Sequence, residues 1–246
     1  MNVNSITKSI TNWLKDYSIK NNIQTLVIGV SGGIDSAVTS AICARTGLNV
    51  IALSMPINQI KSLHSLSNKQ LNWLKNNFKN VKTHNIDLSN TYLSFNKALI
   101  KKYNSDLGFA NSKARLRMTT LYQIAASSNG IVVGTGNKVE DFGVGFFTKY
   151  GDGGVDISPI ADCNKTLVWK IGKYLKIPEQ IIDAPPTDGL WNDGRTDEDQ
   201  LGMTYKELED AMVNPKNKNY KKYMDIRKNN LHKMRPIPIF KLKGLK

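Results

Sequence analysis

The stretch TLVIGVSGGIDSAV, residues 25–38, constrains the fold of this chain more than any other part of the sequence. A run of apolar residues is followed by a Ser-Gly-Gly turn and then by small residues suited to a helix. A short apolar run bounded by glycine predicts a buried strand, and paired glycines let the backbone turn sharply and approach a ligand. The stretch therefore predicts a strand–loop–helix unit of an α/β fold, with the loop where such folds bind ligands.

The same alternation of apolar runs and helical patterns continues along the chain. Further strands are predicted at residues 49–55, 81–88 and 130–136, and helices at residues 5–20, 36–45, 66–77, 107–128, 166–175 and 204–212. Strands that alternate with helices imply right-handed crossovers and a parallel sheet. Because the strands are nearly continuous apolar runs, we expect an α/β fold with a Rossmann-like parallel sheet and helices on both faces.

Three segments carry expectations of their own. The buried face of the first helix should hold Ile6, Ile10, Trp13, Leu14 and Tyr17. The Gly-rich segment 138–158 is expected to be irregular. The polar segment APPTDGLWNDGRTDEDQ, residues 184–200, predicts either a mobile lid or a solvated loop.

The length of 246 residues suits one substantial core or at most two modest ones. No internal repeat or linker divides the chain, so residues 1–246 are expected to form a single domain. No apolar run approaches the roughly 20 residues that cross a bilayer, and the N-terminus does not look like a signal peptide. We therefore expect a cytoplasmic protein with no membrane partner. Cys43 and Cys163 lie far apart without metal-type spacing and are not expected to form a disulfide or a catalytic thiol.

The net charge of +14, from 34 basic and 20 acidic residues, admits two kinds of partner. A basic protein can bind nucleic acid. A substrate that carries several phosphates also suits a basic protein. The lysines are scattered rather than gathered in blocks, so the charge alone does not decide between these partners.

The loop after the first strand is suited to phosphate oxygens. Gly32 and Gly33 permit positive φ and close approach of the backbone, and Ser31 and Ser36 add hydroxyl donors. The helix that follows directs free N–H groups and a positive dipole end toward an anion. The lysine of a Walker loop is absent, and Asp35 would repel bare phosphate unless Mg²⁺ lies between them. The alternative is a Gly-rich turn in which Asp35 is an ordinary acid of a first helical turn.

Two further segments carry chemical groups. The Gly-rich segment 145–160 offers donors and acceptors for a polar ligand, or forms a surface hairpin; its charged residues are Lys149, Asp152 and Asp156. Arg115 and Arg117 are two residues apart and point to different helix faces, so one can reach an anion while the other packs, or both are surface charges. Glu140 follows a strand end and is either a second metal carboxylate or a helix acid.

Five segments together carry a resemblance to a known family. The order SGGIDS resembles the Ser-Gly-Gly-x-Asp-Ser loop of the N-type ATP pyrophosphatases (PP-loop enzymes), which hold the β- and γ-phosphates so that pyrophosphate leaves as a unit. With this loop, four segments in order resemble the ammonia-dependent NAD synthetase family from about residue 29 to residue 238: NSKARLRMTTLYQIA (111–125), GTGNKVE (134–140), GFFTKYGDGGVDISPI (145–160) and LHKMRPIP (231–238). The resemblance implies the adenine nucleotide alpha hydrolase-like variant of the Rossmann-like fold.

The sequence departs from the family pattern at three places. Ile34 stands where the family often has Gln, which should matter little because the backbone makes the contacts. The common family sequence GTDHAAE becomes GTGNKVE, and one extra residue precedes GFFTKYGDGG. This shift leaves Asp141 as an alternative to Glu140 for the metal, and the spacing from Thr135 favours Glu140.

The resemblance also implies site residues. The ATP positions that it implies are Gly29, Val30, Ser31, Gly32, Gly33, Ile34, Asp35, Ser36, Thr135, Lys165 and Thr187. The deamido-NAD positions are Arg115, Lys149, Asp156, His232 and Lys233, although His232 alone would read as a surface histidine. Asp35 and Glu140 would bind Mg²⁺. Asp35 and Lys165 would act on ATP, and Asp152 is the candidate for binding ammonium or accepting its proton, with a turn role as the alternative.

The resemblance implies the last step of NAD biosynthesis. The nicotinate carboxylate of deamido-NAD would attack the α-phosphorus of ATP, and ammonia would then displace AMP from the acyl-adenylate. The motifs begin at residue 29, so we expect no glutaminase domain and therefore free ammonia or ammonia from another protein. A homodimer is expected. The alternatives are another adenylating enzyme of the superfamily, such as a tRNA-modifying enzyme, and a nucleotide-binding module without catalysis.

Overall fold

A four-stranded parallel sheet forms the centre of the protein, for which a computed structural model describes residues 2–58, 61–191 and 193–242. The strands are β1 (Thr25–Gly29), β2 (Asn49–Ser54), β3 (Val81–Asn85) and β4 (Gly130–Val132), in the spatial order β3-β2-β1-β4. Thr25 of β1 pairs with Asn49 of β2 and with Gly130 of β4. The central strand β1 therefore directs its loop to the carboxyl edge of the sheet between two neighbours, where parallel sheets bind ligands.

Helices surround this sheet and continue beyond it. The helices are α1 (Val3–Lys20), α2 (Ile34–Arg45), α3 (Lys61–Asn77), α4 (Ser89–Ala98), η1 (Lys101–Tyr103), α5 (Asp106–Ser127), η2 (Lys138–Val144), α6 (Lys165–Tyr174), α7 (Glu179–Ile182), α8 (Asp197–Leu201), α9 (Tyr205–Val213) and α10 (Tyr220–Met234).

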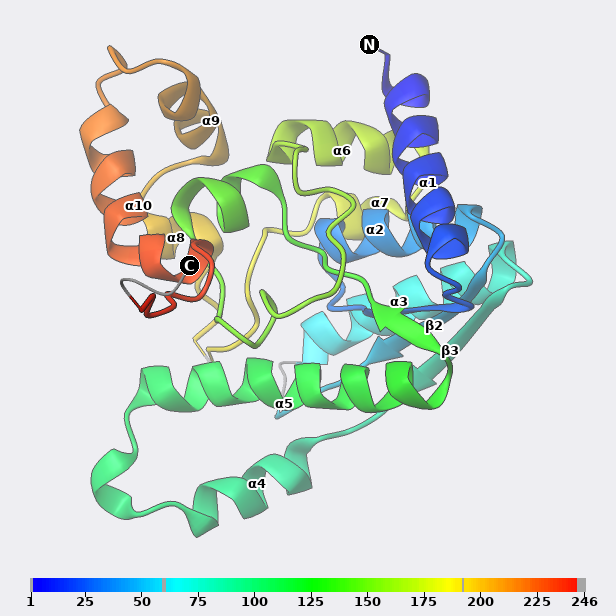
Figure 1. Ribbon diagram of the computed structural model, residues 1–246, viewed down its shortest axis with the longest axis horizontal. Helices are drawn as coiled ribbons and strands as arrows, with labels where there is room; N and C mark the ends of the chain where they lie inside the picture. The colour runs from blue at the N-terminus through cyan, green and yellow to red at the C-terminus, as the bar shows by residue number, and fades with distance from the viewer. Residues whose placement is uncertain (1, 59–60, 192, 243–246) are drawn as a thin grey trace.

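The helices cover both faces of the sheet. In Figure 1, α1, α2 and α6 lie above the sheet and α5 and α4 lie below it. One apolar core joins the sheet to α2, α6 and α7, with buried residues such as Leu26, Ile42 and Ile171. A second core joins the opposite face to α5 and includes Val27 and Leu121. The expected Rossmann-like sheet with helices on both faces is confirmed.

A third apolar cluster lies beside the carboxyl edge of the sheet. It joins η2 to α8, α9 and α10 through residues such as Val144, Tyr205 and Leu208. The guanidinium of Arg227 on α10 donates to the carbonyl oxygens of Phe142 and Gly143 at the end of η2. Because terminal helix carbonyls lack partners within the helix, these bonds fix η2 against α10.

The N-terminal helix forms as expected, and of its expected face Leu14 is buried while Ile6 and Ile10 pack partly buried against the core. The buried residues of α1 are Thr7, Thr11, Leu14 and Ser18. The expectation for Trp13 and Tyr17 is wrong, since their side chains are 48% and 39% exposed. The hydroxyls of Thr7, Thr11 and Ser18 donate to carbonyls one turn earlier, which satisfies them inside the packed face.

Several helices were not expected from the sequence. Both α4 and α10 bury a single residue, Tyr92 and Tyr223, so neither shows the apolar stripe that predicts a helix. The expectation of an irregular segment from residue 138 is wrong for η2, whose start Asn137 caps by accepting from two backbone N–H groups. The strand β4 is shorter than expected: its pairing with β1 ends at Val132, and Val133 forms an isolated bridge to Ile157. In the described part of the chain, both cysteines are free and buried, and no helix is long and apolar enough to cross a membrane.

Candidate active site

The loop from Gly29 to Ser36 forms the base of the candidate site. Gly32 has φ +92°, a conformation that favours glycine, whereas Gly33 has an ordinary φ of −85° and begins α2 without a side-chain cap. The first N–H groups of α2 therefore have no partner within the helix and face the loop. Ser36 accepts from the Ser31 amide and lies 3.1 Å from the Ser31 hydroxyl, which holds the loop in shape. The loop presents N–H donors to a ligand, as a phosphate site requires.

Ile34 lines the cavity, but its side chain is almost entirely buried. It is 2% exposed and belongs to the core between the sheet and α6. A side chain added at Gly172 of α6 would lie 2.7 Å from its Cδ1 atom. The residue at this loop position therefore contributes packing through its side chain and ligand contacts only through its backbone.

Lys165 joins two of the predicted metal carboxylates. Its Nζ lies 2.5 Å from Asp35 Oδ2 and 2.8 Å from Glu140 Oε1. Lys165 is the first residue of α6 and is only 1% exposed, a costly place for a cation because it is buried and at the positive end of a helix. Burial opposes its charge, yet the two carboxylates raise its pKa above the ordinary value. The three side chains therefore form one compensated charge group.

A second layer of polar groups holds these carboxylates in place. The Asn137 amide donates to Asp35 Oδ1 at 3.1 Å, and the Tyr205 hydroxyl donates to Glu140 Oε1 at 2.5 Å. Burial alone would raise the pKa of Glu140, but Lys165 and these hydrogen bonds lower it below its usual value. The Tyr205 hydroxyl oxygen also lies 3.1 Å from Oδ2 of Asp197, whose pKa burial raises to about 7. Glu140 is thereby kept as a carboxylate in contact with Lys165.

These groups line one cavity of about 240 Å³. Its walls also include Met55 from the end of β2, Arg117 from α5, and Thr135 and Thr187 from loops. The acidic and basic residues in the wall are Asp35, Glu140, Asp141, Asp152, Asp188, Asp197, Arg117 and Lys165. The wall is thus acidic in balance although the chain as a whole is strongly basic. A polyanionic ligand would need a cation to enter such a site.

Asp141 and Asp152 also line the cavity. Asp152 Oδ1 accepts from the Thr148 amide at 3.0 Å, and burial raises its pKa to about 6. The Asp141 carboxylate fills the space beside Gly136, where an added Cβ would lie 1.9 Å from its Oδ2 atom. Gly136 is the position at which this chain lacks the aspartate of the common family sequence. The structure therefore places the Asp141 carboxylate beside this position, whereas Glu140 shares Lys165 with Asp35.

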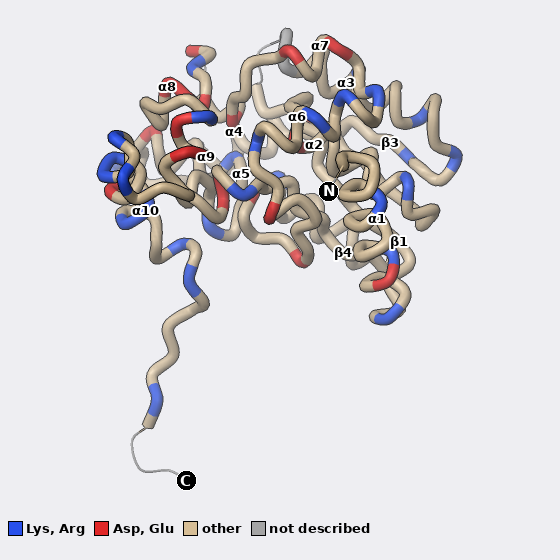
Figure 2. The backbone as a smooth tube through the Cα atoms, turned by 90° about the horizontal axis from the view of Figure 1, so that it is seen from above, with Lys and Arg blue, Asp and Glu red and all other residues tan. Residues whose placement is uncertain are grey.

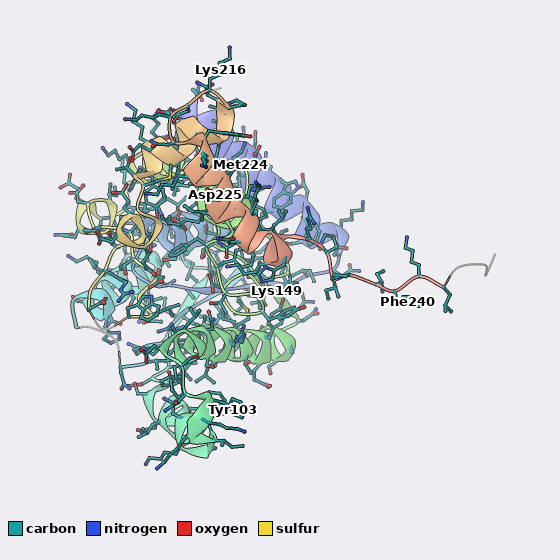
Figure 3. The ribbon with its side chains drawn as sticks, turned by 90° about the vertical axis from the view of Figure 1, so that its left-hand side faces the viewer. Tyr103, Lys149, Lys216, Met224, Asp225 and Phe240 are labelled. Atoms are coloured by element: carbon teal, nitrogen blue, oxygen red, sulfur yellow. The ribbon has the colours of Figure 1, made fainter. Side chains whose placement is uncertain are left out.

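The five predicted substrate positions lie outside the cavity wall. Arg115 donates to the Lys149 carbonyl at 3.3 Å, and Lys149 Nζ lies 3.4 Å from the His232 carbonyl. Lys233 donates to the Phe147 carbonyl at 2.8 Å. Figure 3 shows Lys149 between α5 and the end of α10. These four residues therefore lie together at one side of the Gly-rich segment.

Asp156, the fifth of these positions, is tied to the sheet. Its Oδ2 accepts from the Val132 amide at 2.7 Å and its Oδ1 from the Tyr122 hydroxyl at 2.9 Å. Both carboxylate oxygens are already engaged within the protein. The geometry therefore gives Asp156 a clear role in joining β4 to α5, and its role toward a substrate stays a prediction.

The carboxylates of Asp35 and Glu140 suit a divalent cation. Both approach one point, the ammonium of Lys165, and oxygen ligands are those that Mg²⁺ takes. No set of three acidic, histidine or cysteine side chains that could hold a metal occurs in the described ranges. Two carboxylates nevertheless fit Mg²⁺, because this ion is usually bound by one or two carboxylates together with substrate phosphates and water.

Comparison with known proteins places this geometry in a family. The NAD synthase family matches residues 6–241 of the chain. The chain belongs to the NAD synthase family. A relative from Finegoldia magna, named NH(3)-dependent NAD(+) synthetase, is 36% identical over 92% of this chain and 90% of its own length. A relative of the same name from Mycoplasma genitalium is 42% identical over 82% of this chain and 80% of its own.

A solved structure extends the similarity to the whole fold. The NMN synthetase of Francisella tularensis matches with a TM-score of 0.91 and 31% identity, covering 98% of this chain and 100% of that one. These matches favour this family over a tRNA-modifying enzyme or a module without catalysis. The four-stranded sheet and the surrounding helices are thus those of a member of the NAD synthase family.

Sequence reasoning missed Asp197, which lines the cavity, and Tyr205, which contacts Glu140 and Asp197, and it left open which of Arg115 and Arg117 points inward. Thr196 and Asp199 form a capping box at the start of α8, and this Thr-x-x-Asp pattern marks a helix start beside Asp197. No such signal marked Arg117. Its spacing from Arg115 shows that the two side chains point to different helix faces, but it does not show which of them points into the cavity. The segment 184–200 contains α8 and part of the wall, and residue 192 lies outside the described residues.

Proposed function

We propose that the protein is a C–N ligase that uses ATP and ammonia to convert deamido-NAD to NAD⁺, with release of AMP and pyrophosphate. The observation that carries the proposal is the convergence, in one cavity, of the Gly29–Ser36 loop with Asp35, Glu140 and Lys165. A phosphate-binding loop without a Walker lysine suits adenylation, in which pyrophosphate is the leaving group. The relatives named NH(3)-dependent NAD(+) synthetase support the substrate assignment.

In this proposal the residues of the chain position and neutralise charge. The N–H groups of the loop bind the β- and γ-phosphates, and Lys165 offsets charge on ATP as bonds to the α-phosphate change. Thr135 and Thr187 line the same cavity and are the further ATP positions. No nucleophilic side chain is needed, because the nicotinate carboxylate itself attacks the α-phosphorus and becomes an acyl phosphate anhydride with AMP.

A bound Mg²⁺ would be held by Asp35 and Glu140 and would supply charge neutralisation on the phosphates. The ammonium of Lys165 lies between the same two carboxylates. It would have to move away from them for the ion to bind there. Lys165 then has its own charge free for the phosphates. The structure thus accounts for a lysine and two acids in one buried group, all of which the reaction uses.

The second half-reaction needs ammonia rather than ammonium. Asp152 lies in the cavity wall, and burial raises its pKa to about 6, so it is an effective acceptor for the proton of ammonium near neutral pH. Ammonia attacks the acyl carbon, the bond to AMP breaks, and the amide forms. Free ammonia serves as the nitrogen donor, in line with the names of the relatives.

The direct test incubates the protein with ATP, Mg²⁺, ammonium and deamido-NAD. We expect NAD⁺, AMP and pyrophosphate in equal amounts, and no product when glutamine replaces ammonium. Formation of ADP, or no NAD⁺ above the background without protein, would exclude the proposal.

A second candidate substrate is nicotinate mononucleotide, with NMN as the product. The observation that favours it is the match over nearly the full length of both chains to a structure named NMN synthetase. The adenylation chemistry is the same, because both substrates carry the same nicotinate carboxylate. They differ only in the AMP half of deamido-NAD. We propose that residues outside the cavity wall, such as Arg115, Lys149 and His232, contact that half. Comparing kcat/KM for the two substrates decides between them.

Two further properties belong to this proposal. We propose a homodimer in which the exposed apolar side chains of the α4–α5 region take part, such as Leu93, Ile100 and Leu107. We place the protein in the cytoplasm because the reaction consumes ATP. Light scattering of the purified protein tests the first, and cell fractionation with antibody detection tests the second.

A further inference from the structure

Arg117 lies beside the carboxyl end of β2, where a hydrogen bond holds its guanidinium. Its Nε donates to the Met55 carbonyl at 2.9 Å, and its side chain lines the same cavity as the Gly29–Ser36 loop. It lies on α5, on the opposite face of the sheet from α2. The guanidinium therefore faces the phosphate loop across the carboxyl edge of the sheet.

Among the described residues, Arg117 forms no ion pair, although the charges of Asp152 and Asp188 act on it from a distance. Lys165, the other cation in the wall, is instead compensated by two carboxylates. Burial lowers the pKa of Arg117 to about 10, so the side chain stays charged at neutral pH. Arg117 is half-buried and lines the cavity, so an anionic ligand there would supply it with a direct counter-ion.

The guanidinium also retains donors for a ligand. No protein acceptor is recorded for its two terminal nitrogens among the described residues, and a planar fork of N–H groups fits a carboxylate or a phosphate with two parallel hydrogen bonds. Asp152, the proposed proton acceptor, lies near enough to act on the charge of Arg117 without forming an ion pair. The anion that Arg117 meets is therefore near the place where ammonia attacks.

We propose that Arg117 is a catalytic residue that binds the anionic oxygens at the reacting centre, on the nicotinate carboxylate or on the α-phosphate that it attacks. This inference rests on the proposed function and adds the group that orients the attack. The loop would hold the departing pyrophosphate from one side, and Arg117 would hold the reacting anion from the other. The Met55 carbonyl fixes the direction of the fork before the ligand arrives.

The test compares Arg117→Met and Arg117→Lys with wild type and with Arg45→Gln, an exposed arginine at the end of α2. We expect kcat/KM to fall about 100-fold or more in Arg117→Met, as for the loss of other charge-stabilising donors, and to recover only partly in Arg117→Lys. Melting temperatures show that each variant is folded. If either folded variant keeps wild-type kcat/KM within about threefold, the proposal is wrong.

Calorimetric binding then identifies the anion. A weaker affinity of Arg117→Lys for AMP assigns the contact to the α-phosphate. Loss of the preference for nicotinate mononucleotide over its uncharged amide assigns the contact to the carboxylate. If neither changes in the variant, Arg117 does not bind the reacting anion. Wild-type product formation tests the proposed function separately, so the two can fail independently.

Discussion

At the scale of single residues, the buried group of Lys165, Asp35 and Glu140 dominates the site. Replacing either acid by its amide removes the charge on one side of a lysine that is only 1% exposed. We expect Asp35→Asn and Glu140→Gln each to lower the free energy of unfolding by about 2 kcal/mol, because a charged hydrogen bond is lost in the interior. We also expect kcat to fall about 100-fold or more.

Denaturant unfolding and steady-state kinetics measure both effects. Asp162→Asn is the matched control, since Asp162 pairs with Lys138 at 2.8 Å but its side chain is 95% exposed. That variant should unfold and react like wild type, because exposed pairs contribute little. A nucleotide-binding module without catalysis would instead bind ATP better after loss of Asp35. Tighter ATP binding in Asp35→Asn with unchanged product formation would contradict our interpretation.

The raised pKa of Asp152 leads to a prediction about pH. Burial raises this pKa from 3.8 to about 6, so the acceptor for the ammonium proton is lost as the pH falls below about 6. At saturating ammonium, kcat should therefore fall with an apparent pKa near 6. Asp152→Asn should remove this limb together with most of the activity. A wild-type profile that is flat from pH 5 to 8 would exclude Asp152 as the acceptor.

The same shift affects stability. The folded protein keeps the proton of Asp152 up to about pH 6, whereas the unfolded chain releases it near pH 4, so this residue favours folding below about pH 4 and loses that contribution as the pH rises to 6. Relative to wild type, Asp152→Asn should therefore be more stable at pH 7 than at pH 4. Denaturant unfolding at these two pH values measures the difference.

The sequence alone could predict those site residues whose role follows from their immediate neighbours in the chain. The loop from Gly29 to Ser36, with Asp35 in the first helical turn, was recognisable because glycine, serine and helix start occur together. That Lys165 bridges Asp35 and Glu140 was not predictable. The three residues are far apart in the chain, on α2, η2 and α6, and only the tertiary fold brings them together.

At the scale of elements, α6 must begin in the right place because Lys165 is its first residue. Glu209 of α9 holds this start: it accepts from the Asn164 amide, the Thr166 backbone N–H and the Thr166 hydroxyl. Removing the carboxylate leaves these donors without an acceptor. We expect Glu209→Ala to lower the free energy of unfolding by about 2 kcal/mol and to lower kcat, since Lys165 is then less precisely placed.

The neighbouring exposed acid of α9 provides the control. Asp210→Ala removes a carboxylate from the same helix without a recorded side-chain hydrogen bond, and it should unfold like wild type. Thermal melts and kinetics of both variants separate the effect on α6 from an effect on α9 alone. Equal melting temperatures for the two variants would show that Glu209 does not hold α6.

The elements differ in how far the sequence determines them. The strands β1 and β2 and the helices α2 and α5 were predicted within a few residues, because continuous apolar runs and helical periodicity mark them. The helices α4 and α10 were not, because each buries one tyrosine and otherwise faces solvent. Their formation depends on contacts such as that of Arg227 with η2, which no local pattern contains.

At the scale of the whole molecule, the chain ends in a tail that leaves the body. Figure 2 shows this segment extending away from α10, and Figure 3 shows Phe240 far from the other labelled residues. The apolar side chains of Ile237, Ile239 and Phe240 are 66%, 80% and 88% exposed. Such side chains are costly in water, so they favour contact with another surface. In the proposed homodimer, a second copy of the chain supplies it.

Removing the residues after Arg235 tests this arrangement. The tail buries little apolar surface within its own chain, so we expect the melting temperature of the truncated protein at low concentration to stay close to that of wild type. The dimer should weaken, and light scattering over a dilution series should show monomer at concentrations where wild type is dimeric. Ile239→Ser with Phe240→Ser should have the same effect with the full length retained. If both proteins dimerise like wild type, the tail is not part of the interface. The exposed apolar side chains of the α4–α5 region are then the next to be substituted.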